Sequence, residues 1–484
     1  MWSDRLPERR RRQLAERLRS VLPAPAAGSR GSRTPLRPVR GGGPPSPEAV
    51  AAELRGERLA WLDGGPGAHR LYARPLATLT VRKGRAKVEG PAGDLAFRAG
   101  GFDLLEAAFA AWGGTAGAAL VGYFGYELAG ELEPLPPPPP DDLGLPDLHL
   151  HLYPAGLLWD GRGWTLEAHS GWNTAWNAAP FPVVETEQLL EKARRQPAHD
   201  LSQGRLAAGP VVSRPGHAGF KAGVERIRER IARGDIFQAN LCRRLEAPLP
   251  EEAGWSLYQR LRAASPADHG AFFNLGGGRA LLSVSPELYL SVRGDVVETR
   301  PIKGTRPRGA NPREDRALAR ELMESEKDRA ELTMIVDVAR NDLGRVCDAG
   351  SVQVPAHAEL ATLPTLHHTV STVQGRLLPD RGPADLLRAS FPPASITGAP
   401  KIRAMSILAG EEEVRRGPAM GAFGWISLSG DLELSVAIRT AVCAKGKVAY
   451  HAGCGIVADS DPELELEESA VKARAFLTAL GASE

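Results

Sequence analysis

The sequence SITGAPKIRAM, residues 395–405, joins small and hydroxyl-bearing residues to the first turns of an amphipathic helical segment. A glycine, a proline and hydroxyl groups beside a helix start leave backbone N–H groups free, and such an end can bind a carboxylate or a phosphate. An ordinary capped helix uses the same residues. Ser395 and Thr397 are therefore candidate ligand-binding residues, and the rest of the chain must decide between these two interpretations.

Strand-like and helix-like segments surround this stretch without regular alternation. Apolar residues at helical spacing predict helices at residues 102–112, 220–231, 312–341 and 462–480. Strands are expected at residues 236–245, 270–275, 281–292, 422–427, 432–443 and 447–452, with two more inside 76–88. Irregular mixing of the two element types favours an α+β fold over a doubly wound α/β sheet.

Changes in composition divide the chain into regions. Residues 1–47 carry the run Arg9–Arg12 among Pro, Gly and Ser, and they predict a disordered basic extension; a tail that contacts RNA or a partner is the alternative. Residues 48–200 read as short strands and turns with few helices. Residues 195–217 are rich in Pro, Gly and Ser and predict a linker before the region 215–480.

The composition argues against several classes of protein. The chain has 60 Lys and Arg against 58 Asp and Glu, so nothing global points to nucleic acid or to an anionic membrane. Its four cysteines form no CxxC pair, which disfavours a disulfide framework or a zinc site and favours a reducing compartment. No apolar run reaches the roughly 18 to 20 residues of a membrane span, and the N-terminus lacks a secretory signal. We expect a soluble, cytoplasmic protein.

Two carboxylate pairs lie in the helices expected late in the chain. Asp328 and Glu331 are three residues apart and therefore share one helix face. Glu465 and Glu468 repeat this spacing, and Lys472 lies one turn beyond them. A solvated face with ion pairs is one interpretation. A Mg²⁺ site is the other, because Mg²⁺ prefers hard oxygen ligands and retains several waters.

Several other positions carry individual hints of a binding site. Arg439 lies in an otherwise apolar strand, where a buried guanidinium needs a bound anion or an ion-pair partner. Lys303 lies at a strand end with little bulk around it; desolvation or a nearby cation can make such a lysine nucleophilic, although most turn lysines are solvated. Residues 452–455 are small and form either a tight turn or a close approach to a ligand. His367 and His368 could be acid, base or structural groups.

Five strings of the sequence, taken together and in this order, resemble motifs of the chorismate-utilising enzyme family. They are SPELYL (285–290), PIKGT (301–305), MIVDVARNDLGRVC (334–347), SITGAPKIRAM (395–405) and GIVADSDPE (455–463). The family includes anthranilate, aminodeoxychorismate, isochorismate and salicylate synthases. The resemblance is strong over residues 215–480 and fainter over 48–200. It implies an α+β fold, a large sandwich of two sheets covered by helices with the site in a deep cleft, and a requirement for Mg²⁺.

The resemblance implies a role for each carboxylate of the two pairs. Glu331 and Glu468 match the residues that hold Mg²⁺ in the family. Glu465 and Asp328 match near neighbours that act through hydrogen bonds and water. Relatives commonly have Glu at position 328, so the shorter Asp departs from the pattern.

The resemblance also implies which residues contact the substrate chorismate. The ring carboxylate would be bound by Arg439, Lys472 and the backbone near Gly453 and Gly455. Glu287 matches the general acid beside the departing hydroxyl, His368 a histidine close to the C4 substituent, and Ser395 a small hydroxyl residue against the ligand. Two departures affect the shape of the pocket: Ala419 stands where many relatives have an aromatic residue, and Cys454 where glycine is usual.

Two positions distinguish the reactions of the family. Isochorismate and salicylate synthases use an early-strand lysine to activate water against C2, and the matching residue here is Gln238, whose amide is no useful base. Anthranilate synthases typically have alanine at the position of Lys303, whereas aminodeoxychorismate synthases share PIKGT. The resemblance therefore implies covalent attack of Lys303 on C2 and amination at C4, for p-aminobenzoate and folate synthesis or a specialised pathway.

The resemblance also implies a source of ammonia, and two alternative functions stay open. The chain has no glutaminase-like cysteine motif, so the resemblance implies a separate glutamine amidotransferase subunit as partner. Anthranilate synthase component I is one alternative; its usual LLES-like tryptophan-binding string is replaced here by LAWLDG at residues 59–64. A non-catalytic scaffold of the same fold is the other, and the intact set of matching residues, including Lys303, Glu287 and Arg439, argues against it.

Overall fold

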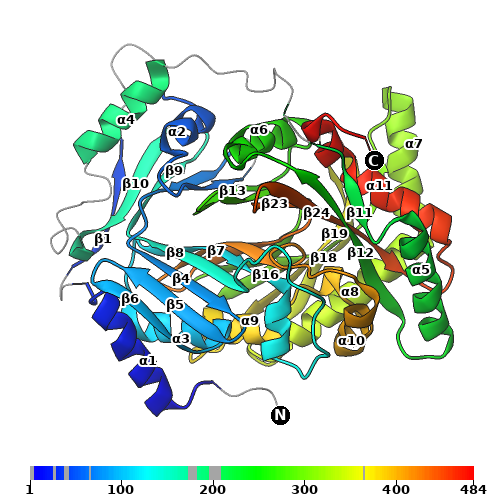
Figure 1. The fold of residues 1–484 in the computed structure, drawn as a ribbon, viewed down its shortest axis with the longest axis horizontal. Coiled ribbons are helices and arrows are strands. Elements are labelled where there is room, and N and C mark those ends of the chain that lie inside the picture. Colours follow the sequence, from blue (N-terminus) through cyan, green and yellow to red (C-terminus); the bar gives the residue numbers. More distant parts are fainter. Residues whose placement is uncertain are drawn as a thin grey trace.

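Two large sheets covered by helices form the centre of the fold (Figure 1). This computed structural model describes residues 5–25, 29–36, 43–64, 67–172, 183–195, 206, 209–363 and 366–483. Each sheet has twelve strands, and every pairing between described strands is antiparallel. The predicted α+β class with a two-sheet sandwich is therefore confirmed.

The first sheet contains the strands that carry Gln238, Gly453 and Gly455. Its strands are β1 (Gly31–Pro35), β2 (Ala60–Asp63), β3 (His69–Tyr72), β9 (Ala155–Trp159), β10 (Trp164–His169), β11 (Val212–Arg214), β12 (Gln238–Pro248), β13 (His269–Gly276), β14 (Arg279–Ser285), β20 (Gly398–Ala399), β23 (Thr440–Ala444) and β24 (Lys447–Ile456). Their order is β1-β10-β9-β3-β2-β13-β14-β23-β24-β12-β11, with β20 paired to β12. The register of β12 on β24 sets Asn240 opposite Gly455.

The second sheet contains the strands that carry Lys303 and His368. Its strands are β4 (Ala77–Arg82), β5 (Arg85–Gly90), β6 (Gly93–Arg98), β7 (Ala119–Phe124), β8 (Leu148–Tyr153), β15 (Leu288–Arg293), β16 (Val296–Arg300), β17 (Ile302–Pro307), β18 (Gln353–Thr362), β19 (Leu366–Arg376), β21 (Ala422–Ser427) and β22 (Leu432–Val436). Their order is β17-β19-β16-β15-β22-β21-β7-β8-β4-β5-β6, with β18 paired to β19. The register of β17 on β19 sets Thr305 opposite His368.

Helices cover the outer faces of the sheets (Figure 1). They are α1 (Glu8–Val21), α2 (Pro47–Leu54), α3 (Gly101–Trp112), α4 (Val183–Arg195), α5 (His217–Ala232), α6 (Gly254–Ala264), α7 (Pro312–Glu324), α8 (Glu326–Gly344), α9 (Pro383–Ser390), α10 (Lys401–Glu411) and α11 (Pro462–Leu480), with short 3-10 helices η1 (Tyr126–Glu131), η2 (Ser170–Trp172), η3 (Glu251–Ala253) and η4 (Ala394–Ile396). Helices α5, α6 and α11 pack on the first sheet, and α8 packs on the second. No helix in the described part of the chain is both long enough and apolar enough to cross a membrane.

Both sheets mix strands from the two regions 48–200 and 215–480. In the first sheet β2 pairs with β13, and in the second β7 pairs with β21. The two regions are therefore parts of one fold and share both hydrophobic cores of the sandwich. Of the linker expected at 195–217, residues 196–205, 207 and 208 lie outside the described residues, and the described part contains strand β11.

The prediction of a disordered extension over residues 1–47 is wrong for its described part. Residues Glu8–Val21 form α1, and Leu14, Leu18 and Val21 are buried against the rest of the protein. Strand β1 pairs with β10. The three buried positions follow helical spacing, which was a usable signal, but the arginine run at the exposed face of the same helix obscured it.

Three elements predicted as continuous are interrupted in the structure. The helix expected at 312–341 is divided into α7 and α8. The division lies at Ser325, whose hydroxyl accepts a hydrogen bond from the N–H of Asp328 at 3.2 Å and so caps the start of α8. The strand expected at 281–292 breaks at Pro286, which places Glu287 between β14 and β15. The strand expected at 432–443 breaks around Arg439, whose φ of 48° lies in the left-handed region.

Candidate active site

The glycine backbone of β24 lies beside Gln238 and Lys303, the two side chains that the resemblance associates with the choice of reaction. A Cβ placed on Gly455 would lie 2.2 Å from Nε2 of Gln238 and 3.6 Å from Nζ of Lys303. A Cβ on Gly453 would lie 2.5 Å from Sγ of Cys242. Any side chain at position 455 would therefore overlap the Gln238 amide. Glycines in a strand interior are typical of a place where a ligand or another backbone approaches closely.

Lys303 faces a carboxylate of helix α8. Its Nζ is 3.9 Å from Oε2 of Glu331, and both side chains are largely buried. The Nε2 of Gln238 donates a hydrogen bond to the same oxygen at 3.5 Å. The Oε1 of Gln238 is buried and has no hydrogen-bond partner among the described residues. A buried acceptor without a partner marks a polar position that a bound ligand or water would satisfy.

Glu287 is a buried carboxyl group within electrostatic range of Lys303. Burial raises its pKa to about 7, while the hydroxyl of Ser395 and the charges of Lys303 and Arg439 act in the opposite direction. Its backbone is fixed, because the carbonyl of Glu287 accepts a hydrogen bond from the N–H of Val436 at 3.0 Å. A carboxyl group with a pKa near 7 can carry a proton at neutral pH and release it to a departing group.

His368 presents one free ring nitrogen to the site. Its Nδ1 lies 3.2 Å from the carbonyl oxygen of Gly304 and 3.0 Å from the hydroxyl of Thr305. A carbonyl oxygen only accepts, so Nδ1 carries the hydrogen and Nε2 is left as an acceptor. This Nε2 is buried and has no partner in the described part of the chain. Burial and the charge of Arg439 lower the pKa of His368 to about 4, so the ring is neutral at pH 7.

Two cations border the site from the side of β23 and α11. Arg439 is largely buried, its pKa is lowered by that burial, and no carboxylate of the described chain forms an ion pair with it. Lys472 donates to the carbonyl oxygen of Gly453 at 2.9 Å and pairs with Glu468 at 2.7 Å. A buried guanidinium without a counter-ion favours binding of an anionic ligand. The strained backbone of Arg439 is typical of functional positions.

The four carboxylates of the predicted metal site divide into two kinds. Glu331 and Glu468 influence each other electrostatically, and each also faces a lysine: Lys303 lies 3.9 Å from Glu331, and Lys472 lies 2.7 Å from Glu468. Burial, followed by the charges of Asp328 and Glu468, raises the pKa of Glu331 against the opposing effect of nearby lysines. Burial alone would raise the pKa of Glu468, but Lys472 and two further lysines lower it below its usual value. A cation bound near both carboxylates would relieve this repulsion.

The other two carboxylates are held by neighbouring side chains. Glu465 accepts a hydrogen bond from the hydroxyl of Ser460 at 2.6 Å. Asp328 forms an ion pair with Arg306 at 3.4 Å. Cys454 lies within reach of Glu465 and Glu468, but burial raises the pKa of its thiol, which donates to the carbonyl oxygen of Glu465. A neutral thiol is a poor ligand for a hard cation, so the donor set that fits Mg²⁺ is the oxygens of Glu331 and Glu468.

Ser395, the first residue of the stretch 395–405, lies beside Glu287. The hydroxyl of Ser395 is buried, and its interaction with the Glu287 carboxyl acts to lower the pKa of that group. The hydroxyl of Thr397 donates to the carbonyl of Ala394 at 3.0 Å, so this predicted ligand-binding group is engaged within its own loop. A cavity of about 20 Å³ lies between Ser395, Glu287 and Asp342, which is room for about one water-sized molecule.

Lys401 and Asp342 are residues of this region that the sequence interpretation missed. The Nζ of Lys401 donates to Oδ2 of Asp342 at 2.7 Å and to the carbonyls of Ser390 and Pro392 at 2.9 and 3.1 Å. A lysine in the first turn of a helix opposes the helix dipole, and that unfavourable position was the available signal. The pair joins α8 to α10 and fixes the backbone that leads to Ser395.

Comparisons with known proteins agree with the motifs and the fold. The profile of the family described as chorismate binding enzyme matches residues 57–478. Anthranilate synthase component 1 of Streptomyces coelicolor is 40% identical over 378 residues, which cover 75% of this chain and 73% of that protein. Aminodeoxychorismate synthase component 1 of Escherichia coli is 37% identical over 364 residues, covering 74% and 76% respectively.

A solved structure extends the comparison to three dimensions. Anthranilate synthase component I from Streptococcus pneumoniae superposes with a TM-score of 0.74 at 29% identity, covering 85% of this chain and 92% of that chain. Relatives with two different names match this chain to similar extents, so similarity alone leaves the subtype open. The family itself is shown by the extent of these matches: this chain belongs to the chorismate binding enzyme family.

Proposed function

We propose that this protein is the synthase subunit, component I, of an aminodeoxychorismate synthase. It would convert chorismate and ammonia to 4-amino-4-deoxychorismate, the precursor of p-aminobenzoate in folate synthesis. The observation that carries the proposal is the position of Lys303, with Nζ directly beside the bare backbone of Gly455 and 3.9 Å from Glu331. A lysine in this position occupies the space from which ammonia would otherwise approach C2.

The first half of the reaction would use Lys303 and Glu287. The neutral amine of Lys303 attacks C2 of chorismate, both ring double bonds shift towards C4, and the bond from C4 to its hydroxyl breaks. Glu287 gives its proton to the departing hydroxyl, which leaves as water. The pKa of Glu287, raised by burial to about 7, supports this role because a substantial fraction of the carboxyl groups carries a proton at neutral pH.

The second half of the reaction exchanges one nitrogen for another. Ammonia attacks C4, both ring double bonds shift back, and the bond between Lys303 and C2 breaks. One proton from the incoming ammonia returns to Glu287, so the carboxyl group is restored. The lysine blocks C2 during this step, and amination therefore ends at C4. The neutral His368, with its unpartnered Nε2 close to this position, is available to accept a hydrogen bond from the C4 substituent.

Binding of the substrate would depend on the cations and on the glycines. Arg439 and Lys472 would bind the ring carboxylate, and the bare backbone at Gly453 and Gly455 gives room for it. Glu331 and Glu468 would hold Mg²⁺, which when bound supplies positive charge for the same carboxylate. Ammonia would come from glutamine through a glutamine amidotransferase subunit as partner.

Anthranilate synthase component I is the second candidate, favoured by the 40% identity of the Streptomyces coelicolor relative. One assay separates the two functions. Purified protein is incubated with chorismate, Mg²⁺ and excess ammonium at mildly alkaline pH, and products are identified by chromatography and mass. Aminodeoxychorismate supports the proposal. Anthranilate as the direct product contradicts it and assigns the second function.

A further inference from the structure

The N-terminal segment 5–22 is an integral part of the structure although it precedes the residues matched by the family. Helix α1 within it packs against α3 through buried Leu14 and Leu18. The indole N–H of Trp112 on α3 donates to the carbonyl of Leu22 at 3.0 Å. We call residues 5–22 the N-terminal clamp, because both of its ends are fixed to the body of the protein.

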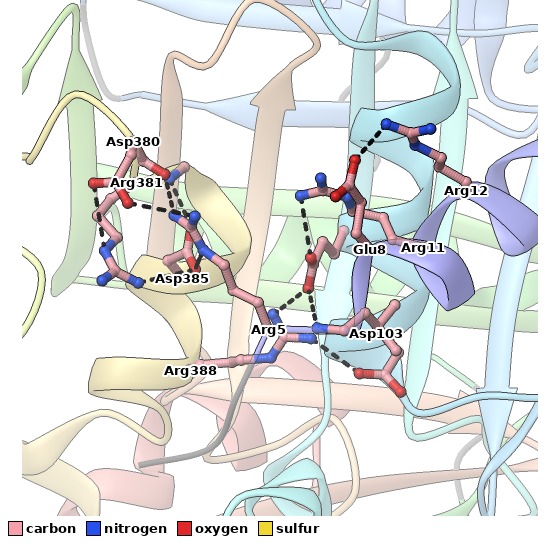
Figure 2. A network of polar contacts seen from close by, with 12 residues as sticks. Arg5, Glu8, Arg11, Arg12, Asp103, Asp380, Arg381, Asp385 and Arg388 are labelled. Atoms are coloured by element: carbon pink, nitrogen blue, oxygen red, sulfur yellow. Dashed lines mark hydrogen bonds and ion pairs between the residues drawn. The ribbon is translucent and has the colours of Figure 1, made fainter.

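The first residue of the clamp holds the start of helix α9 (Figure 2). The guanidinium of Arg5 makes two hydrogen bonds to the carboxylate of Asp385, at 2.8 and 3.0 Å. Asp385 also accepts from the N–H of Gly382 at 3.0 Å, immediately before α9. A two-point contact between an arginine and a carboxylate fixes orientation as well as distance. Burial raises the pKa of Asp385, but Arg5 and the Gly382 N–H outweigh it and keep the carboxyl ionised.

Helices α3 and α9 are joined to the clamp through one shared carboxylate. Oε2 of Glu106 accepts from the backbone N–H of Leu6 at 3.3 Å and from Arg388 at 2.6 Å. Arg388 also donates to Asp103 at 2.9 Å, as Figure 2 shows, and only 8% of its surface is exposed. The buried guanidinium therefore ties α9 to α3 at the point where the clamp begins.

The far end of α9 leads directly into the active-site loop, residues 390–397. The hydroxyl of Ser390 lies 2.7 Å from that of Tyr289, and the Ser390 carbonyl is one of the acceptors of Lys401. The ring of Phe391 packs on Phe102 of α3, with centroids 5.7 Å apart. The chain then runs through η4 to Ser395 beside Glu287. An eight-residue helix spans about 12 Å, so α9 links the two places as one rigid element.

We infer that the N-terminal clamp positions the active-site loop for catalysis, and that Arg5 and Arg388 are positioning residues which act through α9. Neither side chain reaches the reacting atoms. They hold the helix whose continuation places Ser395 against the proton donor Glu287. This inference rests on the role of Glu287 in the proposed function, and it adds a contribution from a segment outside the residues that the family match covers.

The test uses the full chain with Arg5→Ala, Arg388→Ala and the conservative variants Arg5→Lys and Arg388→Lys. Arg12→Ala is the matched control, because Arg12 lies in the same N-terminal clamp, is exposed, and pairs with Glu8 rather than with α9. Should Arg388→Ala fail to fold, the Arg5 variants decide, since Arg5 is about one-third exposed. Two properties are measured well below the melting temperature: amide hydrogen exchange of residues 391–397, and turnover of chorismate with Mg²⁺ and ammonium.

We expect faster exchange at 391–397 in both alanine variants but not in the control. We also expect kcat to fall by about 10- to 100-fold with KM for chorismate nearly unchanged, because small displacements of catalytic groups have effects of this size. The lysine variants should recover part of the loss. Exchange and kcat equal to those of Arg12→Ala, with only a lower melting temperature, would overturn the inference. If the wild type shows no turnover, the proposed function fails separately and the exchange comparison still decides on the clamp.

Discussion

Gly455 and Gln238 approach so closely that a Cβ on Gly455 would lie 2.2 Å from Nε2 of Gln238. The same amide donates to Glu331, which in turn lies 3.9 Å from the ammonium of Lys303. These contacts join the first sheet, the second sheet and helix α8 at one point. A change in one member of this set must therefore move the others, which gives a direct test of the geometry.

We expect Gly455→Ala to lower kcat/KM for chorismate by about 100-fold, because the new methyl group displaces Gln238 and thereby the lysine beside it. Gln238→Ala removes the obstructing amide. Steady-state kinetics of the two single variants and the double variant check the relationship. The double variant should be more active than Gly455→Ala alone. Strictly additive losses would show that the two residues do not compete for the same space.

The pH dependence of kcat/KM reports on Glu287. Its carboxyl group must carry a proton to act as an acid, and its pKa is about 7, so activity should fall as pH rises above about 7. Glu287→Gln should lower kcat by about 100- to 10,000-fold and remove this limb from any residual activity. If the variant still loses activity as pH rises above about 7, the ionisation belongs to another group.

The same ionisation affects stability with a defined sign. The folded protein holds the Glu287 proton more tightly than the unfolded chain, because burial raises the pKa from 4.5 to about 7. Its contribution to stability is therefore present below about pH 4.5 and is lost as pH rises towards 7. Denaturant unfolding at several pH values, compared between wild type and Glu287→Gln, should show a smaller decline over this interval in the variant.

Adjacent glutamates on α11 provide a matched test of the proposed metal site. Both glutamates are exposed to solvent, but within the described part of the chain Glu468 is electrostatically coupled to Glu331 and Glu467 is not. We expect Glu468→Gln to raise the Mg²⁺ concentration needed for half-maximal activity by about 100-fold or more. Glu467→Gln should leave the Mg²⁺ titration unchanged. Equal titrations for both variants would exclude Glu468 as a ligand.

The buried pair of Lys401 and Asp342 should contribute strongly to stability. Lys401→Met leaves the buried carboxylate of Asp342 with only the more distant Arg345, 3.9 Å away, which we expect to cost about 3 kcal/mol in unfolding free energy. Asp342→Asn in the same chain should recover part of that loss. Arg403→Met on the same helix is the control: its ion pair with Asp235 is largely exposed and should contribute at most about 1 kcal/mol. A loss for Lys401→Met no larger than that of the control would contradict the account.

Local patterns predicted the elements but not their interruptions. The hairpin of β4 and β5, helix α5 and helix α11 lie where alternation or helical spacing placed them. The break at Ser325 could not be read in this way, because the apolar spacing continues through it and only a side-chain cap separates the helices. Likewise the strand pattern runs through Arg439, whose backbone is held in the left-handed region by tertiary contacts.

Interactions between distant segments also limit how much of the site could be predicted from local sequence patterns. The motifs brought Lys303, Glu287, Glu331 and Gly455 to attention, and the structure places them in one region. Spacing gave no information on which carboxylates remain available, and Asp328 and Glu465 prove to be engaged by Arg306 and Ser460. The pairing of Lys401 with Asp342 joins residues 59 positions apart, which no local pattern reveals.

The most direct test of the account is to capture the covalent intermediate on Lys303. Protein is mixed with chorismate and Mg²⁺ without ammonium, quenched, and digested, and its peptides are examined by mass spectrometry. We predict an adduct with the mass of chorismate less one water on the peptide that contains Lys303, depleted when ammonium is added and absent from Lys303→Ala. If no adduct forms, and Lys303→Ala still makes aminodeoxychorismate at the wild-type rate, the covalent role of Lys303 is contradicted.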